Sequence, residues 1–221
     1  MGFLDFLFPK KCFGCGRGGI YVCVNCLSKT KTPKTFCPVC RRPSISGLTH
    51  SSCTKPSVLS GLITLFSYEG VVKKAIGQLK YNFVEDCAEE LAGLCALKLK
   101  DLHQAKDVIL VPVPLHKTRE RWRGFNQASS VGENIAALMD WKFVPDLLER
   151  TSKTKPQVGL EKKLRKYNVK GVFKLNPKYK LKSSNFVLFD DVWTTGSTMK
   201  EACKVLKRNG AKSVWGITIA S

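Results

Sequence analysis

Two adjacent carboxylates, Asp190 and Asp191, stand after a short apolar run and before a loop of small hydroxylic residues. Carboxylate oxygens placed there can accept hydrogen bonds from sugar hydroxyls. The loop supplies hydroxyl donors, and the helix expected after it offers unpaired backbone N–H groups and a partial positive charge to an anion. The loop residues are Thr194, Thr195, Gly196, Ser197 and Thr198. The segment predicts a site for both a phosphate and a ribose. An ordinary capped turn is the alternative, but capping alone does not require adjacent carboxylates.

A second set of reactive side chains lies near the N-terminus, where seven of the ten cysteines fall within the first 53 residues. They form pairs two residues apart, and in the last pair a histidine replaces the first cysteine. Each short gap lets a tight turn aim two ligands at one ion, and thiolate with imidazole suits zinc. The expected ligands are Cys12, Cys15, Cys23, Cys26, Cys37, Cys40, His50 and Cys53. They could hold one or two zinc ions.

The pairing of these ligands has a simplest solution, in which the first four residues form one site and the last four form the other. An interleaved pairing stays open at this point. A metal-free cluster is disfavoured, because a module of this size has little hydrophobic core and needs a cross-link. The remaining cysteines, Cys87, Cys95 and Cys203, lie in apolar helix-like stretches, where we expect them to be buried.

A basic segment follows the apolar run that ends in Pro112. Prolines stiffen its beginning, and residues 123–127 set one guanidinium and two amides around an expected tight turn. We interpret residues 111–127 as a loop that binds anions; a solvated basic loop is the alternative. Its candidate ligand-binding residues are Pro114, Leu115, His116, Lys117 and Arg123.

The whole chain is strongly basic, with 37 lysines and arginines against 17 acidic residues and a net charge of +20. This surplus favours polyanionic partners, either nucleic acid or phosphorylated metabolites, although a solvated basic surface would have the same composition. The segment from Arg150 to Phe173 is polar, basic and punctuated by proline and glycine. We expect it to act as a lid that closes over a phosphorylated ligand; a plain connector is the alternative.

The elements that must position these residues alternate along the chain. Apolar runs predict strands over residues 62–68, 107–114, 186–189 and 213–219, and apolar spacings of three and four predict helices over 71–81, 84–102, 127–139 and 198–207. Strands that alternate with helices indicate an α/β fold with a parallel sheet covered on both faces. Ligands bind such sheets at the carboxyl ends of the strands, where Pro112 and Asp190 both fall.

No apolar run approaches the roughly 20 residues needed to span a membrane. The apolar start, residues 1–8, is short, is broken by Asp5 and lacks a basic region, so we predict no signal peptide. A cytoplasmic location follows as an expectation, and there paired cysteines favour metal over disulfides.

Taken together, these motifs resemble the ComF family of competence-protein-F-like proteins over nearly the whole chain. The resemblance rests on the cysteine pairs, on Val111-Pro112-Val113-Pro114-Leu115-His116 and Arg123-Gly124-Phe125-Asn126-Gln127, on Thr154-Lys155-Pro156-Gln157 with Leu160, Arg165 and Asn168, and on the segment from Asp190 to Thr198. It implies a type I phosphoribosyltransferase-like domain at 58–221 behind a zinc-binding module at 1–57. The pair His50-x-x-Cys53 departs from the Cys-x-x-Cys of many relatives, which leaves the second zinc site open.

The resemblance also implies a function. It implies binding of phosphoribosyl pyrophosphate with Mg²⁺ and a role in DNA uptake for natural transformation, with single-stranded DNA and other uptake proteins such as a helicase as partners. In an enzyme of this kind, Asp190 and Asp191 would hold the ribose and stabilise charge that develops on it, residues 194–198 would hold the 5-phosphate, and the basic loop would hold pyrophosphate. A non-catalytic DNA-binding protein, which uses the loop for ligand sensing or phosphate contact, is the alternative.

Overall fold

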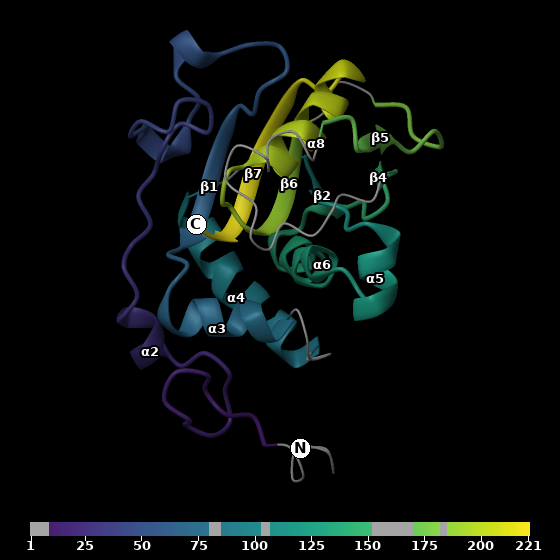
Figure 1. Ribbon diagram of the computed structural model, residues 1–221. Coiled ribbons are helices and arrows are strands. Elements are labelled where there is room, and N and C mark those ends of the chain that lie inside the picture. The colour runs from purple at the N-terminus through teal and green to yellow at the C-terminus, as the bar shows by residue number, and fades with distance from the viewer. Residues whose placement is uncertain (1–8, 80–84, 103–106, 152–169, 182–184) are drawn as a thin grey trace.

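A five-stranded parallel β-sheet forms the centre of the molecule, which is described here from a computed structural model (Figure 1). The structure describes residues 9–79, 85–102, 107–151, 170–181 and 185–221. The strand order is β1–β7–β6–β2–β3, and all neighbouring strands are parallel. The strands are β1 (Gly61–Phe66), β2 (Val108–Pro112), β3 (Lys142–Phe143), β6 (Asn185–Val192) and β7 (Ser213–Ala220).

Helices cover both faces of this sheet, as expected for strands that are apolar on both sides. Alternate residues of β6 supply two separate cores: Val187 and Phe189 pack with α3, α4 and α6, whereas Phe186 and Leu188 pack with α8. The helices are α3 (Gly70–Leu79), α4 (Glu85–Leu102), α6 (Gln127–Met139) and α8 (Ser197–Arg208). The predicted α/β fold with a parallel sheet flanked by helices is confirmed.

The carboxyl ends of the central strands meet at one edge of the sheet. Pro112 of β2 lies opposite Phe189 of β6, and Asp190 lies opposite Thr218 of β7. The Val113 N–H donates to the carbonyl of Phe189 (2.8 Å), which extends the β2–β6 pairing by one residue. The loop after β2 and the loop after β6 therefore start side by side, as the predicted topology requires.

A short helix, α5 (Lys117–Arg123), corrects the prediction that residues 111–127 form a loop. His116 caps its start, because the imidazole Nδ1 accepts a hydrogen bond from the Thr118 N–H (3.2 Å). Gly124 ends it in the left-handed conformation (φ +81°). Because the His116 cap and Gly124 enclose only seven residues, the helix is too short to show an apolar period. It therefore cannot be predicted from the apolar pattern alone.

A small antiparallel pair, β4 (Leu148–Arg150) and β5 (Phe173–Leu175), was also not predicted. Arg150 and Phe173, the two ends of the predicted lid, lie opposite each other in this pair, and the Arg150 guanidinium lies 5.5 Å from the centre of the Phe173 ring. Phe173 is buried and belongs to a structural pair rather than to a polar lid, which corrects the limits of that segment. Its interior, residues 152–169, lies outside the described residues.

The N-terminal module contains little regular structure: α2 (Val24–Ser28) and two 3₁₀ turns, η1 (Ile45–Gly47) and η2 (Ser51–Cys53). Its first half packs on α3 and α4, where the Glu90 carboxylate accepts hydrogen bonds from the N–H groups of Tyr21 (3.0 Å) and Val22 (2.6 Å). Its second half pairs with the start of β1, since Leu48 bridges Gly61. Figure 1 shows the module extending along the side of the sheet that β1 borders.

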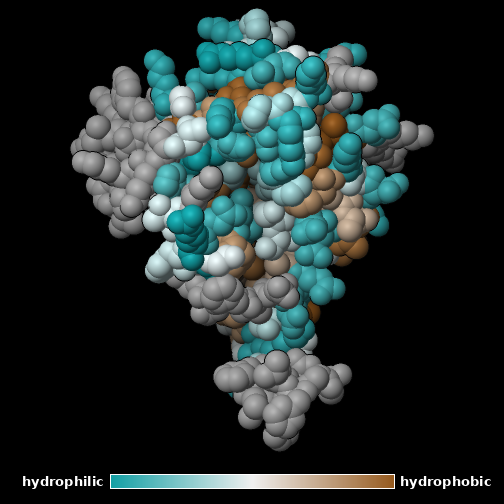
Figure 2. All heavy atoms as spheres, turned by 90° about the vertical axis from the view of Figure 1, so that its right-hand side faces the viewer, coloured by the Kyte–Doolittle hydropathy of each residue, from teal (hydrophilic) through white to brown (hydrophobic). Residues whose placement is uncertain are grey.

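The surface is predominantly polar on the face shown in Figure 2, where hydrophobic side chains form small patches between hydrophilic ones. None of the helices that the structure describes is long and apolar enough to cross a bilayer.

Candidate functional site

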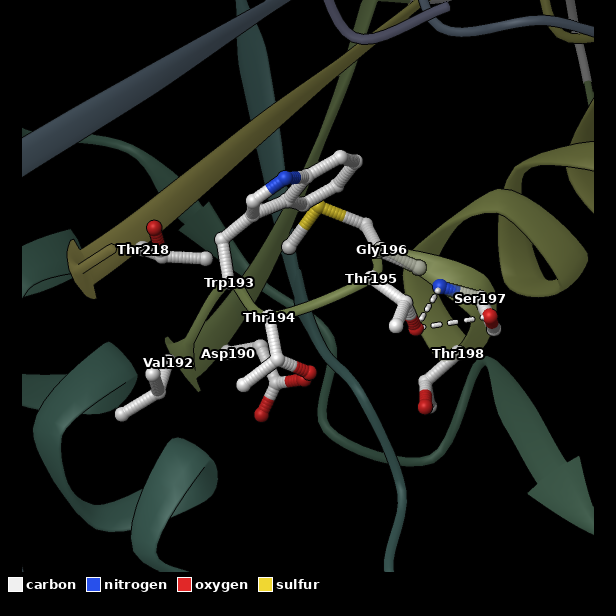
Figure 3. A pocket seen from close by; sticks show the side chains of 10 residues that line it. Asp190, Val192, Trp193, Thr194, Thr195, Gly196, Ser197, Thr198 and Thr218 are labelled. Carbon is white, nitrogen blue, oxygen red and sulfur yellow. Dashed lines mark hydrogen bonds between the residues drawn. The ribbon is translucent and has the colours of Figure 1, made fainter. Parts of the chain in front are cut away.

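A pocket opens at the carboxyl edge of the sheet, where β6 gives way to α8 (Figure 3). Asp190, near the end of β6, lies on one side of it, and the first residues of α8 lie on the other. Thr218, from the neighbouring strand β7, forms part of the wall. All five loop residues of the predicted phosphate site, Thr194, Thr195, Gly196, Ser197 and Thr198, line this pocket.

Hydroxyl groups organise the turn into α8. The Thr195 hydroxyl lies 2.8 Å from the Ser197 hydroxyl and accepts a hydrogen bond from the Ser197 N–H (3.3 Å). The first four N–H groups of an α-helix have no partner within the helix, and they carry the positive end of its dipole. Here the first turn of α8 borders the pocket, so this end of the helix is placed to receive an anion.

Gly196 turns the chain from the loop into α8, and its backbone is left-handed (φ +70°). A Cβ atom at this position would lie 2.1 Å from Cη2 of Trp193, which is closer than two non-bonded carbon atoms can approach. The Trp193 ring is buried under the loop and packs near Phe36 of the N-terminal module, with 6.4 Å between the ring centres. Both backbone conformation and space therefore require glycine at residue 196.

Two buried polar atoms beside the pocket lack a hydrogen-bond partner within the described part of the chain. They are Nε1 of Trp193 and Oγ1 of Thr218, and both residues line the pocket. A buried donor or acceptor without a partner costs free energy, and in native proteins it is usually satisfied by water or a ligand. A hydroxyl-rich ligand in the pocket would fit this requirement.

The two predicted carboxylates occupy different positions. Asp190 lines the pocket and lies beside Thr194 (Figure 3), and its Oδ1 accepts a hydrogen bond from the Asp191 N–H (2.9 Å). Asp191 is the next residue of the same strand, and neighbouring residues of a strand point to opposite faces. Asp191 does not belong to the set of residues that line the pocket. The structure thus brings Asp190, but not Asp191, together with the loop.

The predicted basic loop is only partly open to ligands. Asn126 caps α6, because its Oδ1 accepts from the Ala128 N–H (3.1 Å) and its Nδ2 donates to the carbonyl of Val113 (3.2 Å). The Nε of Arg123 is buried without a partner in the described structure. Pro114, Leu115 and His116 are half-buried before α5, and the side chain of Lys117 lies outside the described atoms. Asn126 therefore holds the turn rather than facing a ligand.

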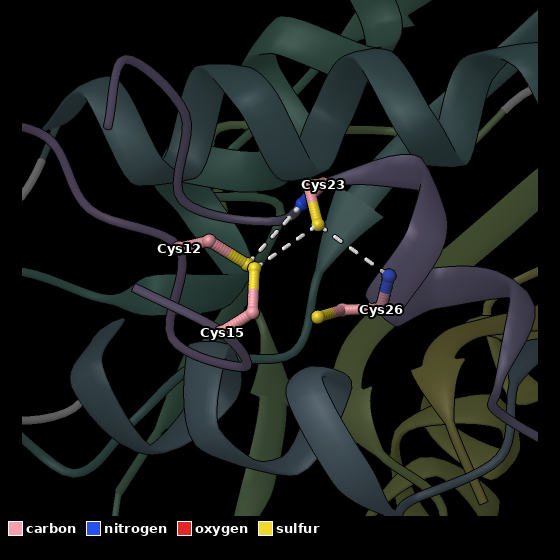
Figure 4. A group of neighbouring side chains, drawn as sticks. All are labelled: Cys12, Cys15, Cys23 and Cys26. Carbon is pink, nitrogen blue, oxygen red and sulfur yellow. Dashed lines mark hydrogen bonds between the residues drawn. The ribbon is translucent and has the colours of Figure 1, made fainter. Parts of the chain in front are cut away.

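The first cysteine cluster brings together the ligands of the sequential pairing (Figure 4). The Sγ atoms of Cys12, Cys15, Cys23 and Cys26 all lie within 4.8 Å of one another. The Cys12 sulfur accepts from the Gly14 N–H (3.4 Å) and the Cys23 N–H (3.5 Å). Four sulfurs at this spacing fit a tetrahedral zinc site.

The second cluster contains Cys37, Cys40, His50 and Cys53, whose ligand atoms also lie within 4.8 Å of one another. His50 Nδ1 lies 3.3 Å from the Cys40 sulfur, and its Nε2 lies 3.1 Å from the carbonyl of Pro43. A metal-binding histidine commonly donates its second N–H to such a carbonyl, which orients the ring toward the ion. The departure at His50 is thus compatible with a complete second ligand set.

Each cluster contains one thiol that readily ionises. Burial opposes the charge of Cys12, but backbone N–H groups, that of Cys23 foremost, lower the pKa of its thiol to about 6. The backbone N–H of Arg42 is the main cause that lowers the pKa of Cys40 to about 6. In contrast, a hydrogen bond with Cys23 raises the pKa of Cys26 to about 12. A thiolate in each cluster favours metal binding, because zinc binds the deprotonated sulfur.

Several residues at the site were not identified from sequence. Arg41 donates a hydrogen bond from Nη2 to the carbonyl of Thr194 (2.8 Å), across 153 residues of sequence. Thr218 enters the pocket only because β7 pairs with β6. Outside the residues that line the pocket, Trp122 of α5 is 70% exposed, in a helix that the apolar pattern does not predict. For Arg41 a local signal existed, namely a long basic side chain directly after a Cys-x-x-Cys turn.

Comparison with known proteins shows similarity over both parts of the chain. Residues 3–55 match the family described as the double zinc ribbon domain. DNA utilization protein YhgH of Escherichia coli (strain K12) is 33% identical over 218 residues, which cover 93% of this chain and 94% of that protein. Competence protein F of Haemophilus influenzae is 29% identical over the full length of both chains, and competence protein ComFC of Bacillus subtilis is 26% identical over 90% of this chain and 83% of its own length.

Among solved structures, a hypoxanthine phosphoribosyltransferase from Staphylococcus aureus aligns with 61% of this chain and 62% of its own, at 12% identity and a TM-score of 0.37.

The double zinc ribbon match and the two clusters of potential ligands together show a zinc-binding module at the N-terminus.

Proposed function

Because this chain belongs to the ComF family, together with competence protein F and the DNA utilization proteins, we propose that it binds phosphoribosyl pyrophosphate and acts in DNA uptake in the cytoplasm. Under this proposal residues 58–221 hold the phosphorylated ligand, and residues 1–57 hold one zinc ion in each cysteine cluster. The observation that carries the proposal is the single pocket shared by Asp190 and residues 194–198.

The pocket offers a partner for each part of such a ligand. The hydroxyls of residues 194–198 and the start of α8 are suited to the 5-phosphate. The Asp190 carboxylate is suited to the ribose hydroxyls, and Asp191 would act from the end of the same strand. Pro114, Leu115 and His116 before α5, together with Lys117 and Arg123 at the two ends of α5, would receive the pyrophosphate. Mg²⁺, held mainly by the ligand, would neutralise the charge of the pyrophosphate.

If a transfer reaction takes place, the protein does not need to supply a nucleophile, because an acceptor attacks the anomeric carbon as pyrophosphate leaves. The role of Asp190 would then be electrostatic, since a carboxylate close to the sugar favours the positive charge that develops in the transition state. Binding without transfer, as a ligand sensor, uses the same groups.

We test ligand binding with Asp190→Asn, which keeps the shape of the side chain and removes its charge. Calorimetric titration with phosphoribosyl pyrophosphate and Mg²⁺ should show a loss of affinity of about 10-fold or more, since a hydrogen bond to a charged group contributes roughly 1.5–3 kcal/mol. The matched control is Asp140→Asn at the end of α6, where asparagine also tolerates the left-handed backbone (φ +55°). Equal affinities of the wild type and Asp190→Asn would contradict the proposed site.

For DNA, the supporting observation is an exposed aromatic ring in a basic helix. Trp122 is 70% exposed and lies between Arg121 and Arg123 in α5. An indole face can stack on any base, and flanking arginines attract the backbone, which is the usual combination in proteins that bind single strands. The net charge of +20 adds non-specific attraction to phosphates.

The test for DNA uses a fluorescent single-stranded oligonucleotide and a salt series. Trp122→Ala should weaken binding about 5- to 150-fold at every salt concentration, because stacking contributes roughly 1–3 kcal/mol per base. Arg121→Ala should instead reduce the slope of log K against log salt by about one phosphate contact. Leu97→Ala, which truncates an exposed apolar side chain on α4, is the control. Unchanged affinity in Trp122→Ala would exclude α5 as the stacking surface.

These two tests separate the candidate functions. If the sugar phosphate binds through Asp190 and DNA through Trp122, Asp190→Asn should lose only the first affinity and Trp122→Ala only the second. A protein that binds only DNA, and loses that binding in Asp190→Asn, would use the pocket as a phosphate contact.

A further inference from the structure

Each cysteine cluster begins with a Cys-x-x-Cys turn, and these two zinc-binding turns, residues 12–17 and 37–42, have the same backbone hydrogen bonds. In the first, the Gly16 N–H donates to the carbonyl of Cys12 (2.8 Å), and in the second the Arg41 N–H donates to the carbonyl of Cys37 (2.9 Å). A second bond also matches: the Cys12 N–H donates to the carbonyl of Arg17, and the Cys37 N–H donates to the carbonyl of Arg42. Gly16 and Arg41 therefore occupy equivalent positions in the two turns.

That position requires a left-handed backbone in both turns. Gly16 has φ +77° and Arg41 has φ +64°. Glycine adopts this conformation without steric cost, whereas a side chain with a Cβ atom does so only at a cost in free energy. The second turn thus carries an arginine where the first shows that glycine suffices. A residue kept in a disfavoured conformation points to a role for its side chain.

The side chain of Arg41 reaches the loop of the candidate site. Its Nη2 donates to the carbonyl of Thr194 (2.8 Å), and Thr194 lines the pocket. Phe36, directly before the same turn, contacts the neighbouring residue Trp193, and the two ring centres lie 6.4 Å apart. Two consecutive residues of the loop are therefore held by the second zinc-binding turn.

Holding this carbonyl constrains the pocket. A peptide unit is planar and trans, so the Thr194 carbonyl and the Thr195 N–H point in opposite directions and rotate together. With the carbonyl bound to Arg41, the direction of the Thr195 N–H is set, and Thr195 also lines the pocket. The guanidinium adds a positive charge at the edge of a site suited to anions.

We propose that Arg41 is a positioning residue for the loop of residues 194–198. Through Arg41, the second zinc cluster sets the affinity of the pocket for its phosphorylated ligand. This proposal rests on the proposed function, since it concerns the ligand of that pocket. Arg41 directly follows Cys40, a member of the second cluster. Because small zinc-binding turns are ordered by their metal, zinc at this cluster places the guanidinium. The module is then a part of the binding site and not a separate attachment.

The test compares three substitutions at one position. Arg41→Gly removes the side chain and relieves the left-handed backbone, Arg41→Asn removes it but also tolerates that conformation, and Arg41→Lys keeps the charge without the planar fork. We expect the glycine and asparagine variants to bind as much zinc as the wild type, and Arg41→Gly to melt at the same or a higher temperature. Both should bind phosphoribosyl pyrophosphate with Mg²⁺ about 10-fold more weakly, with Arg41→Lys in between.

A second readout does not depend on the ligand. In protein labelled with 5-fluorotryptophan, the ¹⁹F resonance of Trp193 is assigned from Trp193→Phe and reports on the loop directly. Arg41→Gly should shift this resonance in the ligand-free protein. Arg17→Gly, which removes a charge from the exposed part of the first turn, should change neither the resonance nor the affinity.

The outcomes separate the two proposals. Wild-type affinity and an unshifted Trp193 resonance in Arg41→Gly would overturn the positioning role. Loss of zinc in proportion to the loss of affinity would also overturn it, because the metal rather than Arg41 would carry the effect. If the wild type does not bind phosphoribosyl pyrophosphate at all, the proposed function fails, while the Trp193 resonance still decides whether Arg41 holds the loop.

Discussion

At the scale of single residues, the candidate site depends on positions where backbone conformation and space agree. Gly196 combines a left-handed backbone with direct contact to the Trp193 ring. Thr195 uses one hydroxyl to hold both the side chain and the backbone of Ser197. These residues shape the loop before any ligand arrives, and such preorganisation lowers the cost of ordering on binding.

We predict that Gly196→Ala disrupts this loop. The added methyl group would overlap the Trp193 ring, and the left-handed backbone disfavours alanine, so we expect a loss of stability of about 1–3 kcal/mol and at least a tenfold loss of ligand affinity. Thermal melting and calorimetry measure the two effects. Gly77→Ala, in an open position within α3, is the control and should be neutral or stabilise by up to about 1 kcal/mol. Unchanged affinity in Gly196→Ala would contradict the role of the loop.

At the scale of elements, α8 connects the pocket to the small β4–β5 pair. Glu201 is buried on α8, accepts a hydrogen bond from the Gly171 N–H (2.8 Å) and pairs with Lys204 (2.9 Å). Gly171 lies just before β5, so Glu201 ties the helix that starts at the pocket to the end of the segment predicted as a lid. Burial tends to raise the pKa of Glu201, but Lys204 and the Gly171 N–H outweigh it and lower the pKa.

This lowered pKa predicts a pH-dependent contribution to stability. A carboxylate whose folded pKa is below its ordinary value of 4.5 stabilises the fold above that pH, and the contribution is lost as pH falls through the folded pKa. Glu201→Gln should therefore be about 1 kcal/mol less stable than the wild type at pH 7, with a smaller difference in acid.

Urea unfolding at a series of pH values measures the effect. Glu149→Gln, which breaks an exposed pair with Lys174, is the control and should change stability by less than about 0.5 kcal/mol. A difference between the wild type and Glu201→Gln that stays constant down to acid pH would show that the charge of Glu201 is not responsible.

At the scale of the whole molecule, the N-terminal module joins the larger domain at two separate places. Glu90 of α4 binds the first half through backbone N–H groups, and the second half pairs with the start of β1, an edge strand of the central sheet, where Leu48 bridges Gly61. Covering an exposed edge strand prevents pairing with other chains. The module therefore occupies the start of this edge strand as well as contacting the pocket loop.

Zinc removal should divide the ten cysteines into two classes. The seven cysteines of the module should become reactive toward an alkylating reagent when a chelator removes the metal. Cys87, Cys95 and Cys203 should stay unreactive, because all three are buried, and burial raises the pKa of Cys87 and of Cys203 to about 12. Mass spectrometry of alkylated protein counts the modified sites.

Protein unfolded in guanidinium is the control and should be modified at all ten cysteines. Early modification of Cys203 after chelation would show that the core beside α8 opens once the module loses its metal. Protection of the module cysteines after complete zinc removal would show that the clusters are held by contacts other than the metal.

The local chemistry could be predicted from sequence to different degrees at each scale. The cysteine pairs indicated zinc because ligand spacing is a local property, and the loop of residues 194–198 was identified because strand, acid pair and hydroxyl residues are consecutive. The helix α5 and the strands β3, β4 and β5 were missed, since a few residues are too short to show a period. Asn126, which the sequence placed in an expected tight turn beside Arg123, serves as a helix cap, and this role depends on where α6 begins.

By itself, the sequence determined the α/β fold, the presence of a zinc-binding module and the edge of the sheet where the candidate site lies, because periodicity and ligand spacing act over a few residues. Tertiary structure alone decided which carboxylate lines the pocket, that Thr218 forms its wall, and that Arg41 reaches Thr194. These facts depend on how strands pair and where a distant module packs. Long-range contacts of this kind leave no local pattern, so they become visible only when the chain is folded.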